Sequence, residues 1–280
     1  MSLRRLCLSL LLLVPMPASA QSAAILAALK DGDSPRVLVA AHRGAHDAAP
    51  ENSLAAIENA IALGVDIVEI DIRLTRDGVP VLMHDATVDR TTNGTGAVAD
   101  LLFSEIAALR LTGADNQPTG LSAPTLTAAL AAARGRVLVD LDLKTRDVEP
   151  ILSRVIEAGM LDQSLFFNGD FALIEKFRAI HAGVLPMPRA RSLATTRQAG
   201  AAFAPEVIHI DPGFNDDATR DAARETDSRL WINALGEPDR LVAQGRAAEA
   251  LAPLLQHGAS IIQTDQPKAV IAWLAASGRR

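Results

Sequence analysis

The sequence predicts an α/β fold, a single-domain (β/α)8 barrel of the TIM type, from two observations. Short β-branched runs alternate with Ala- and Leu-rich stretches of helical periodicity along most of the 280 residues, and this alternation is typical of a parallel barrel. Hydrophobic residues make up 49% of the chain, which is enough to bury one large core. No linker, low-complexity tract or internal repeat divides the sequence, so we expect one barrel domain over residues 21–280.

Nine segments have the composition of strands: residues 36–41, 67–74, 80–84, 137–143, 164–167, 184–187, 207–210, 230–233 and 260–263. Seven have the periodicity of helices: residues 54–63, 126–134, 150–158, 171–180, 216–225, 247–255 and 267–275. A barrel has eight places, so one of the nine is an extra strand or is not a strand. The turn signal at residues 75–78 separates the second and third segments without a helix, so the alternation fails there. A doubly wound open sheet is the competing architecture, but no Gly-rich phosphate loop follows the first strand.

The first 20 residues have the pattern of a secretory signal peptide. Arg4 and Arg5 precede an apolar run over residues 6–14, and residues 18–20 form an Ala-Ser-Ala cleavage signal. The apolar run is too short to span a bilayer, and a short membrane anchor is the alternative interpretation. We expect removal of residues 1–20 and a periplasmic or secreted mature protein.

The composition of the expected mature chain excludes several classes of function. The only cysteine, Cys7, lies in the segment to be removed, which excludes disulfides, thiolate zinc sites and a cysteine nucleophile. The mature chain has 25 basic and 33 acidic residues, and this net charge of −8 argues against a nucleic-acid partner. No second long apolar run or basic amphipathic helix indicates stable membrane insertion, and no segment indicates a protein partner.

Two of the expected strands carry a charged residue at every second position. The side chains that share a face are Glu69 and Asp71 in one strand, and Asp140, Asp142 and Lys144 in the other. Helices cover the outside of a parallel barrel, so the acids must point inward, near its C-terminal mouth. Converging carboxylates repel one another, and a divalent cation such as Mg²⁺ or Ca²⁺ relieves this repulsion. An internal salt bridge to Lys144 or Arg73 is the alternative.

Histidines follow two other expected strands, His42 after the first and His84 after the third. A single histidine at a strand end is often structural, but two of them beside candidate metal ligands favour acid–base catalysis. Arg43 offers a planar guanidinium that matches a phosphate, and Lys144 offers a second positive charge. Together with a metal, these side chains describe a site for an anionic phosphate ester.

Several short motifs occur in a defined order: HRG at 42–44, PENS at 50–53, EID at 69–71, DGVPVLMHD at 77–85, DRTTNGTG at 89–96 and IQTDQP at 262–267. In this order and spacing, densest between residues 42 and 96, the sequence resembles the glycerophosphodiester phosphodiesterase family. The resemblance covers most of the mature chain and implies a barrel with catalysis at its C-terminal mouth. It also implies metal-dependent hydrolysis of a small-molecule glycerophosphodiester to glycerol 3-phosphate and an alcohol.

The resemblance implies roles for individual residues. The general base is expected to be His42 and the general acid His84. The phosphate-binding residues are expected to be Arg43 and Lys144, the metal ligands Glu69, Asp71 and Asp142, and the supports of the first loop Glu51 and Asn52. Glu51 would orient either Arg43 or His42. The family's third metal ligand is usually Glu, so the shorter Asp142 implies a shifted metal, an added water or recruitment of Asp140.

The second half of the sequence departs more from the family. Residues 167–170 (FNGD) stand where a Ser-Phe pair is common, and Trp231 and Asn233 are spaced to face the same side of a strand. Trp231 either lines an alcohol pocket or packs in the core. Arg189 either brings another cation to the mouth or lies in a solvated loop. We interpret the remaining histidines, His46, His181, His209 and His257, as structural. Of these, His209 is expected to point into the barrel.

Two other functions stay open at this point. A phosphodiesterase that acts on phospholipid or sphingolipid head groups would need an apolar rim facing a membrane. A non-catalytic periplasmic glycerophosphodiester-binding protein would hold the same ligand without cleaving it. The presence of both histidines and both acidic pairs argues against the binding protein.

Overall fold

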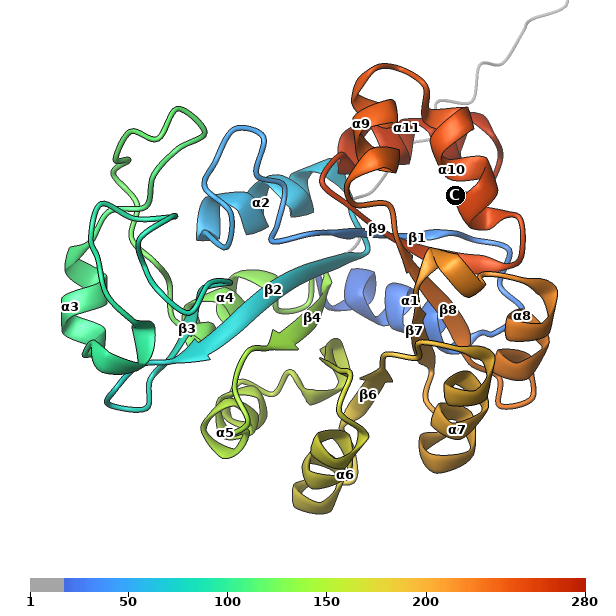
Figure 1. The fold of residues 1–280 in the computed structure, drawn as a ribbon, viewed down its shortest axis with the longest axis horizontal. Helices are drawn as coiled ribbons and strands as arrows, with labels where there is room; N and C mark the ends of the chain where they lie inside the picture. Colours follow the sequence, from blue (N-terminus) through green and yellow to red (C-terminus); the bar gives the residue numbers. More distant parts are fainter. Residues whose placement is uncertain (1–17) are drawn as a thin grey trace, which may run out of the picture.

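Eight parallel strands form a nearly closed barrel that helices surround (Figure 1). The structure is a computed structural model and describes residues 18–280. Neighbouring strands pair in the order β6-β5-β4-β2-β1-β9-β8-β7, and a bridge between Arg189 and His209 links the two ends of this order. The barrel strands are β1 Leu38–Ala41, β2 Ile67–Leu74, β4 Leu138–Leu143, β5 Ser164–Asn168, β6 Leu185–Pro188, β7 Val207–Ile210, β8 Arg229–Asn233 and β9 Ala259–Thr264. The predicted barrel is confirmed, and the competing open sheet is excluded.

Of the nine predicted strands, the third is the extra one, and it corresponds to β3 Pro80–Leu82. It pairs antiparallel with the end of β2 after the turn at residues 75–78, outside the parallel barrel. His84 therefore does not end a barrel strand, contrary to the prediction. It follows a strand that runs back toward the mouth, where the Met83 N–H donates to the Asp71 carbonyl oxygen at 3.0 Å.

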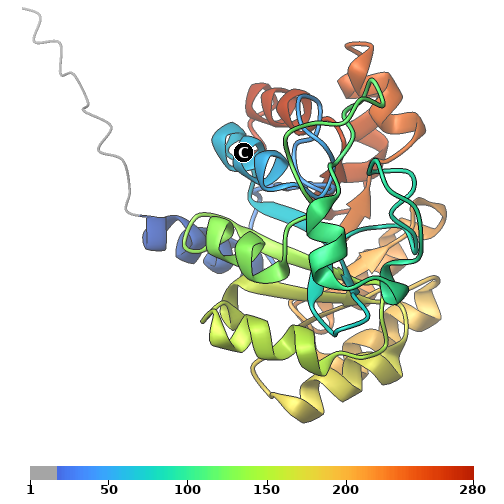
Figure 2. The same cartoon turned by 90° about the vertical axis from the view of Figure 1, so that its left-hand side faces the viewer.

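Helices connect the strands and cover the outside of the barrel (Figures 1 and 2). They are α1 Ala18–Lys30, α2 Leu54–Leu63, α3 Phe103–Ala108, α4 Leu126–Ala133, α5 Glu149–Glu157, α6 Phe171–Ile180, α7 Leu193–Phe203, α8 Asp217–Arg224, α9 Glu237–Ala243, α10 Ala247–Leu255 and α11 Pro267–Ala276, with 3-10 turns at Val98–Asp100, Leu161–Gln163 and Pro212–Phe214. The seven predicted helices are present, whereas α1, α3, α7 and α9 are not predicted by periodicity. In α7, Thr, Arg, Gln and Gly interrupt the apolar face, although Ser192 and Thr195 form a capping box at its start.

Residues 75–125 form a long excursion between β2 and α4, at the left of the barrel in Figure 1. This segment carries its own hydrophobic cluster, formed by Val81, Met83, Val88, Val98, Ile106, Leu111 and Ala123. The cluster gives the excursion a packed interior, so the polar residues around position 84 project from an ordered base.

Alternation along the strands sorts their side chains into two sets. The outward side chains of β2 and β4 pack with the surrounding helices. These side chains are Val68, Ile70, Ile72, Val139, Leu141 and Leu143. The inward side chains near the strand starts form a second apolar cluster, which includes Leu38, Ala40, Ile67, Leu138, Leu165, Met187 and Ile261. The acids of β2 and β4 share this inward face further along each strand and line a cavity. The prediction from strand parity is therefore confirmed.

Helix α1 packs against the starts of the barrel strands. Its Ile25 and Leu29 are buried in the inner apolar cluster, and the Ser22 N–H donates to the Gly135 carbonyl at 3.3 Å. Residues 1–17 of the predicted signal peptide lie outside the described residues, and residues 18–20 begin α1. None of the helices between residues 18 and 280 is long and apolar enough to cross a membrane.

Candidate active site

A cavity of about 240 Å³ opens at the C-terminal mouth of the barrel. Its lining residues are His42, Arg43, Glu69, Asp71, His84, Asp140, Asp142, Lys144, Phe167, Arg189, His209, Asn233, Leu235 and Gln263. The structure thus brings together every residue that the sequence nominated for catalysis, phosphate binding and metal binding. Their chemical roles remain predictions.

Four carboxylates from two neighbouring strands face this cavity. Strands β2 and β4 pair in parallel register, so Glu69 lies beside Asp140 and Asp71 lies beside Asp142. Glu69, Asp71 and Asp140 are each at most 3% exposed. Burial, and then repulsion between the carboxylates, raises the pKa of Glu69 and of Asp140 well above the usual range.

Two cations offset part of this negative charge. Lys144 Nζ lies 2.7 Å from Asp142 Oδ2 and 3.1 Å from Asp71 Oδ1. Arg43 Nε lies 3.3 Å from Asp71 Oδ2. The predicted alternative of an internal ion pair therefore applies to these two aspartates through Lys144. It does not apply through Arg73, whose guanidinium donates to main-chain carbonyl oxygens instead.

The loop after β1 bends Arg43 and Gly44 into the left-handed region of backbone conformation. Their φ angles are 53° and 82°. A Cβ atom at Gly44 would lie 2.7 Å from the carbonyl carbon of Ala56 in α2, so only glycine fits this approach. The turn lets the Arg43 N–H donate to Glu69 Oε2 at 2.8 Å, which ties the loop to the carboxylate cluster.

Glu51 and Asn52 contact this loop in two different ways. Glu51 Oε1 accepts a hydrogen bond from Arg43 Nη1 at 2.8 Å, so of the two predicted targets it orients Arg43 and not His42. The buried Asn52 donates to Asp71 Oδ2 at 2.8 Å, and its Oδ1 accepts from the Asp71 N–H at 3.1 Å. This reciprocal pair fastens the loop to β2.

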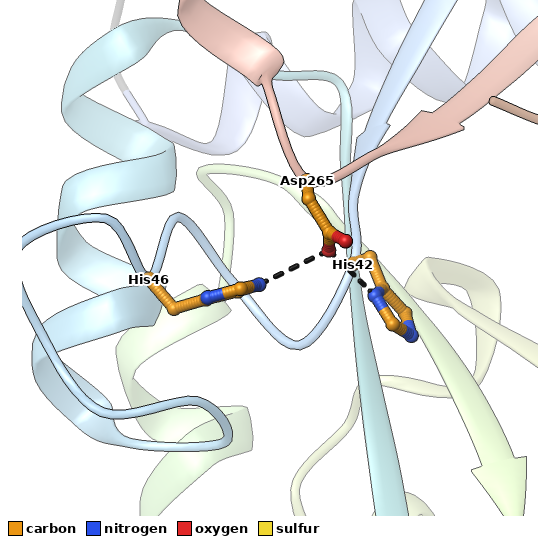
Figure 3. A group of neighbouring side chains, drawn as sticks. All are labelled: His42, His46 and Asp265. Atoms are coloured by element: carbon orange, nitrogen blue, oxygen red, sulfur yellow. Dashed lines mark hydrogen bonds and ion pairs between the residues drawn. The ribbon is translucent and has the colours of Figure 1, made fainter. Parts of the chain in front are cut away.

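A carboxylate that follows the last barrel strand holds His42 (Figure 3). His42 Nδ1 lies 2.7 Å from Asp265 Oδ1, and His46 Nε2 lies 3.1 Å from the same oxygen. Burial opposes ionisation of Asp265, but the hydrogen bonds from both histidines hold its pKa below the usual range. An ionised carboxylate only accepts hydrogen bonds, so Nδ1 of the neutral His42 ring carries the proton and Nε2 is its basic nitrogen. That Nε2 lies 4.0 Å from Glu69 Oε2.

His84 has a carboxylate partner of its own. Its Nδ1 lies 2.7 Å from Asp85 Oδ1. Arg90 donates to both Asp85 oxygens, at 2.6 and 3.1 Å, and to both Glu51 oxygens, at 2.9 and 2.8 Å. These bonds from Arg90, together with that from His84, hold the pKa of Asp85 below its usual range. Through Glu51 and Arg90, the loop that carries Arg43 is connected to the loop that carries His84.

The opposite wall of the cavity comes from β5 to β8. Arg189 lines the cavity and pairs with Asp211, so the cation is at the mouth and the alternative of a solvated loop is wrong. His209 is internal, and burial lowers its pKa to about 4, which keeps the ring neutral. Trp231 is fully buried in the inner cluster, and its indole N–H donates to Asn233 Oδ1 at 3.1 Å. Trp231 is therefore a core residue, and Asn233 is the one of the two that reaches the cavity.

The oxygen-rich side of the cavity has the composition of a site for a hard divalent cation. Glu69, Asp71 and Asp142 each offer an oxygen atom within 4.8 Å of the others. Asp140 Oδ1 is buried without a hydrogen-bond partner among the described residues. Because Mg²⁺ and Ca²⁺ prefer oxygen ligands, these residues fit such a cation.

Comparisons with known proteins point to one enzyme family. Residues 42–163 match the glycerophosphoryl diester phosphodiesterase family. Glycerophosphodiester phosphodiesterase 1 of Homo sapiens is 57% identical over 74 residues, which are 26% of this chain and 22% of that protein, so the chain spans about a fifth of that relative's length. The crystal structure of a glycerophosphodiester phosphodiesterase from Agrobacterium tumefaciens matches with a TM-score of 0.70 and 28% identity, over 84% of this chain and 99% of that one. The family model, the human relative and the solved structure all indicate this family.

The fold is shared across distant phosphodiesterases. An Oleispira antarctica phosphodiesterase matches with a TM-score of 0.72 and 21% identity, over 87% of this chain and 99% of that one. In this chain, sequence reasoning missed four polar residues that surround the two histidines, namely His46, Asp85, Arg90 and Asp265. Asp265 carried a usable signal, since it directly follows a barrel strand just as His42 does. His181 and His257 lie outside the cavity, close to the ends of α6 and α10.

Proposed function

We propose that this protein is a metal-dependent hydrolase that cleaves glycerophosphodiesters to glycerol 3-phosphate and an alcohol. The observation that carries the proposal is the arrangement of His42, His84, Arg43 and Lys144 around one carboxylate-lined cavity. The Oleispira antarctica phosphodiesterase was solved in complex with its product, sn-glycerol-3-phosphate. A protein of this fold therefore accommodates the product expected here.

In the proposed reaction, Arg43 and Lys144 hold the phosphate. Both cations line the cavity, and both already lie next to carboxylates that restrict their side chains. Because the Arg43 guanidinium donates a hydrogen bond to Glu51, it is orientated before substrate binds. Fixed positive groups of this kind stabilise the charge that develops on the phosphoryl oxygens.

His42 acts as the general base in this proposal. Its Nε2 accepts the proton of the attacking oxygen, which belongs either to water or to the glycerol hydroxyl next to the ester. The attacking oxygen forms a bond to phosphorus while the bond from phosphorus to the alcohol oxygen breaks. Asp265 keeps the His42 proton on Nδ1 and stabilises the imidazolium that forms, so it is a positioning residue.

His84 acts as the general acid. Asp85 binds Nδ1 of His84, which leaves Nε2 to donate a proton to the departing alcohol oxygen. The excursion that carries His84 packs on its own cluster, so the acid approaches from an ordered segment outside the barrel. After this step His42 is protonated and His84 is neutral. If the glycerol hydroxyl is the attacking group, the first product is a cyclic phosphodiester, and water then opens it to glycerol 3-phosphate while His84 accepts the proton of that water and His42 donates its proton to the departing glycerol oxygen. If water attacks directly, glycerol 3-phosphate forms in one step and both histidines are reset by proton exchange with solvent.

Glu69, Asp71 and Asp142 would hold the divalent cation. When bound, such a cation polarises the phosphoryl oxygens and neutralises negative charge at the site. The choice between Mg²⁺ and Ca²⁺ depends on ligand number and cavity size, and the shared oxygen chemistry accepts either.

A coupled assay for released glycerol 3-phosphate tests this function. Purified protein would be offered a panel of glycerophosphodiesters with chelator, and then with Mg²⁺, Ca²⁺ or Mn²⁺ restored. His42→Asn and His84→Asn are each expected to lower turnover by about 10²–10⁴, and His181→Asn, outside the cavity, serves as the matched control. Wild-type turnover in both folded variants would refute the two-histidine mechanism.

We also propose that the protein is exported and cleaved after Ala20. Ser22, Ile25 and Leu29 are the buried residues within residues 20–30 of α1, and cleavage after Ala20 retains all three. N-terminal sequencing of protein recovered from the periplasm should begin at Gln21. Recovery of the uncleaved chain from the cytoplasm alone would contradict export.

A further inference from the structure

Asp140 is the one inward carboxylate of β2 and β4 with no Lys, Arg or His nitrogen within 4.0 Å among residues 18–280. Asp140 is 2% exposed, and its Oδ1 has no hydrogen-bond partner among the described residues. It lines the same cavity as the proposed metal ligands. A buried carboxylate in this condition is costly unless a cation or donor reaches it.

The neighbours of Asp140 cannot supply that cation. Lys144 is bound to Asp142 at 2.7 Å and to Asp71 at 3.1 Å. Arg43 is shared between Glu51 and Asp71. Among residues 18–280, Arg43 and Lys144 are the two Lys or Arg side chains within 4.0 Å of the inward carboxylates of β2 and β4, and both are already engaged. The surplus of negative charge therefore lies on the side of Glu69 and Asp140.

The register of the sheet sets Asp140 next to a proposed metal ligand. Glu69 and Asp140 are direct partners across the β2–β4 pair, one layer deeper than Asp71 and Asp142. Lys144 donates a hydrogen bond to the Asp142 carboxylate, and this ion pair weakens Asp142 as a ligand for a divalent cation. Asp140 has no such competitor.

We propose that Asp140 is a fourth carboxylate of the divalent cation site, which binds the cation together with Glu69 and Asp71 and compensates for the engagement of Asp142 with Lys144. The inference rests on the metal dependence of the proposed function and assigns a role to a residue outside the three-carboxylate cluster. It makes the cation site of this chain deeper and more anionic than those three residues alone would provide.

Isothermal titration calorimetry of the metal-free protein with Mg²⁺, Ca²⁺ and Mn²⁺ tests the inference without an activity readout. Asp140→Asn has the same shape and removes only the charge. We expect it to weaken the affinity for the cation by about 10–100-fold, as loss of a close partner of a metal site does. Asp211→Asn is the matched control, because Asp211 is a carboxylate on the opposite wall that is paired with Arg189. It should change the affinity less than about threefold.

Thermal unfolding separates this role from a structural one. Without metal, Asp140→Asn should melt at or above the wild-type temperature, because it removes an unpartnered buried acid. With metal, the variant should gain less stability than the wild type. Unchanged cation affinity in the folded Asp140→Asn variant would overturn the inference while leaving the proposed function intact. A wild-type protein that binds none of the three cations would overturn both the inference and the proposed metal dependence.

Discussion

Replacing Asp265 with Asn perturbs His42 without touching the cavity wall that binds the phosphate. The carboxylate oxygen lies 2.7 Å from His42 Nδ1 and fixes the proton there. The Asp265 main-chain N–H donates to Asp239 Oδ2 at 2.7 Å, so the loop is anchored independently of the Asp265 side chain. Asn at this position therefore keeps the backbone and the side-chain shape but adds an amide that can donate to Nδ1.

The expected size of the effect follows from the tautomer. A donor facing Nδ1 stabilises the tautomer that has its proton on Nε2. In that tautomer Nε2 has no lone pair with which to accept the proton of the attacking oxygen. The variant also loses the negative charge that stabilises the imidazolium formed during the step. Comparable Asp→Asn changes behind a catalytic histidine lower kcat by up to about 10⁴, so we expect a fall of roughly 10²–10⁴ in kcat with little change in KM.

Steady-state kinetics with a glycerophosphodiester would measure this effect, with His46→Gln as the matched control. His46 binds the same Asp265 oxygen, at 3.1 Å, so its replacement also removes a hydrogen bond from the carboxylate. It leaves the contact between Asp265 and His42 in place. We expect His46→Gln to lower kcat less than about tenfold. If Asp265→Asn kept more than a tenth of wild-type kcat, or if both variants fell equally, Asp265 would not be setting the tautomer of His42.

Three further predictions concern stability. Gly44→Ala should destabilise the fold by roughly 2–4 kcal/mol in denaturant unfolding, because of strain at positive φ and overlap with α2. The control Gly64→Ala has a similar φ but open space around its Cβ, and it should cost only about 1 kcal/mol. Equal losses of stability in the two variants would contradict the overlap. Arg90→Gln should lower stability at neutral pH, because Arg90 holds the folded-state pKa of Asp85 below its unfolded value. This contribution is fully present above about pH 4 and declines progressively as the pH falls from there towards the lowered folded-state pKa, so the difference between the two unfolding curves should narrow in acid, and a difference that is the same at pH 7 and pH 2 would argue against the ion pair. Leu29→Ala should destabilise by about 2–5 kcal/mol in thermal or denaturant unfolding, since Leu29 is fully buried beneath the barrel, and a near-neutral effect would mean that α1 is dispensable.

The period-two pattern of β2 and β4 is strong enough to place the acids correctly. In a parallel barrel the outer face must meet helices, so the aliphatic residues Val68 and Ile70 leave only the inward direction for Glu69 and Asp71. The register between the strands then follows from pairing. Sequence reasoning therefore locates the carboxylate cluster because its position depends on local alternation and one global constraint.

The surroundings of the two histidines depend on contacts that local patterns do not encode. Asp265 is 223 positions away from His42, and only closure of the barrel between β1 and β9 brings them together. Arg90 is 39 positions from Glu51, and the pair forms because the excursion after β3 folds back across the mouth. Neither distance leaves a periodic signal in the sequence.

The direction of β3 explains why His84 lines the predicted cavity although it does not end a barrel strand. A segment of β composition after a tight turn can only return along its neighbour, so β3 had to be antiparallel to β2. A histidine at its end then points back into the barrel mouth from outside, whereas His42 enters from within the wall. The proposed base and acid thus belong to separate structural units, one fixed by the barrel and the other by the excursion. Because Glu51 and Arg90 connect those units, their contact should control how well the acid is aligned with the base.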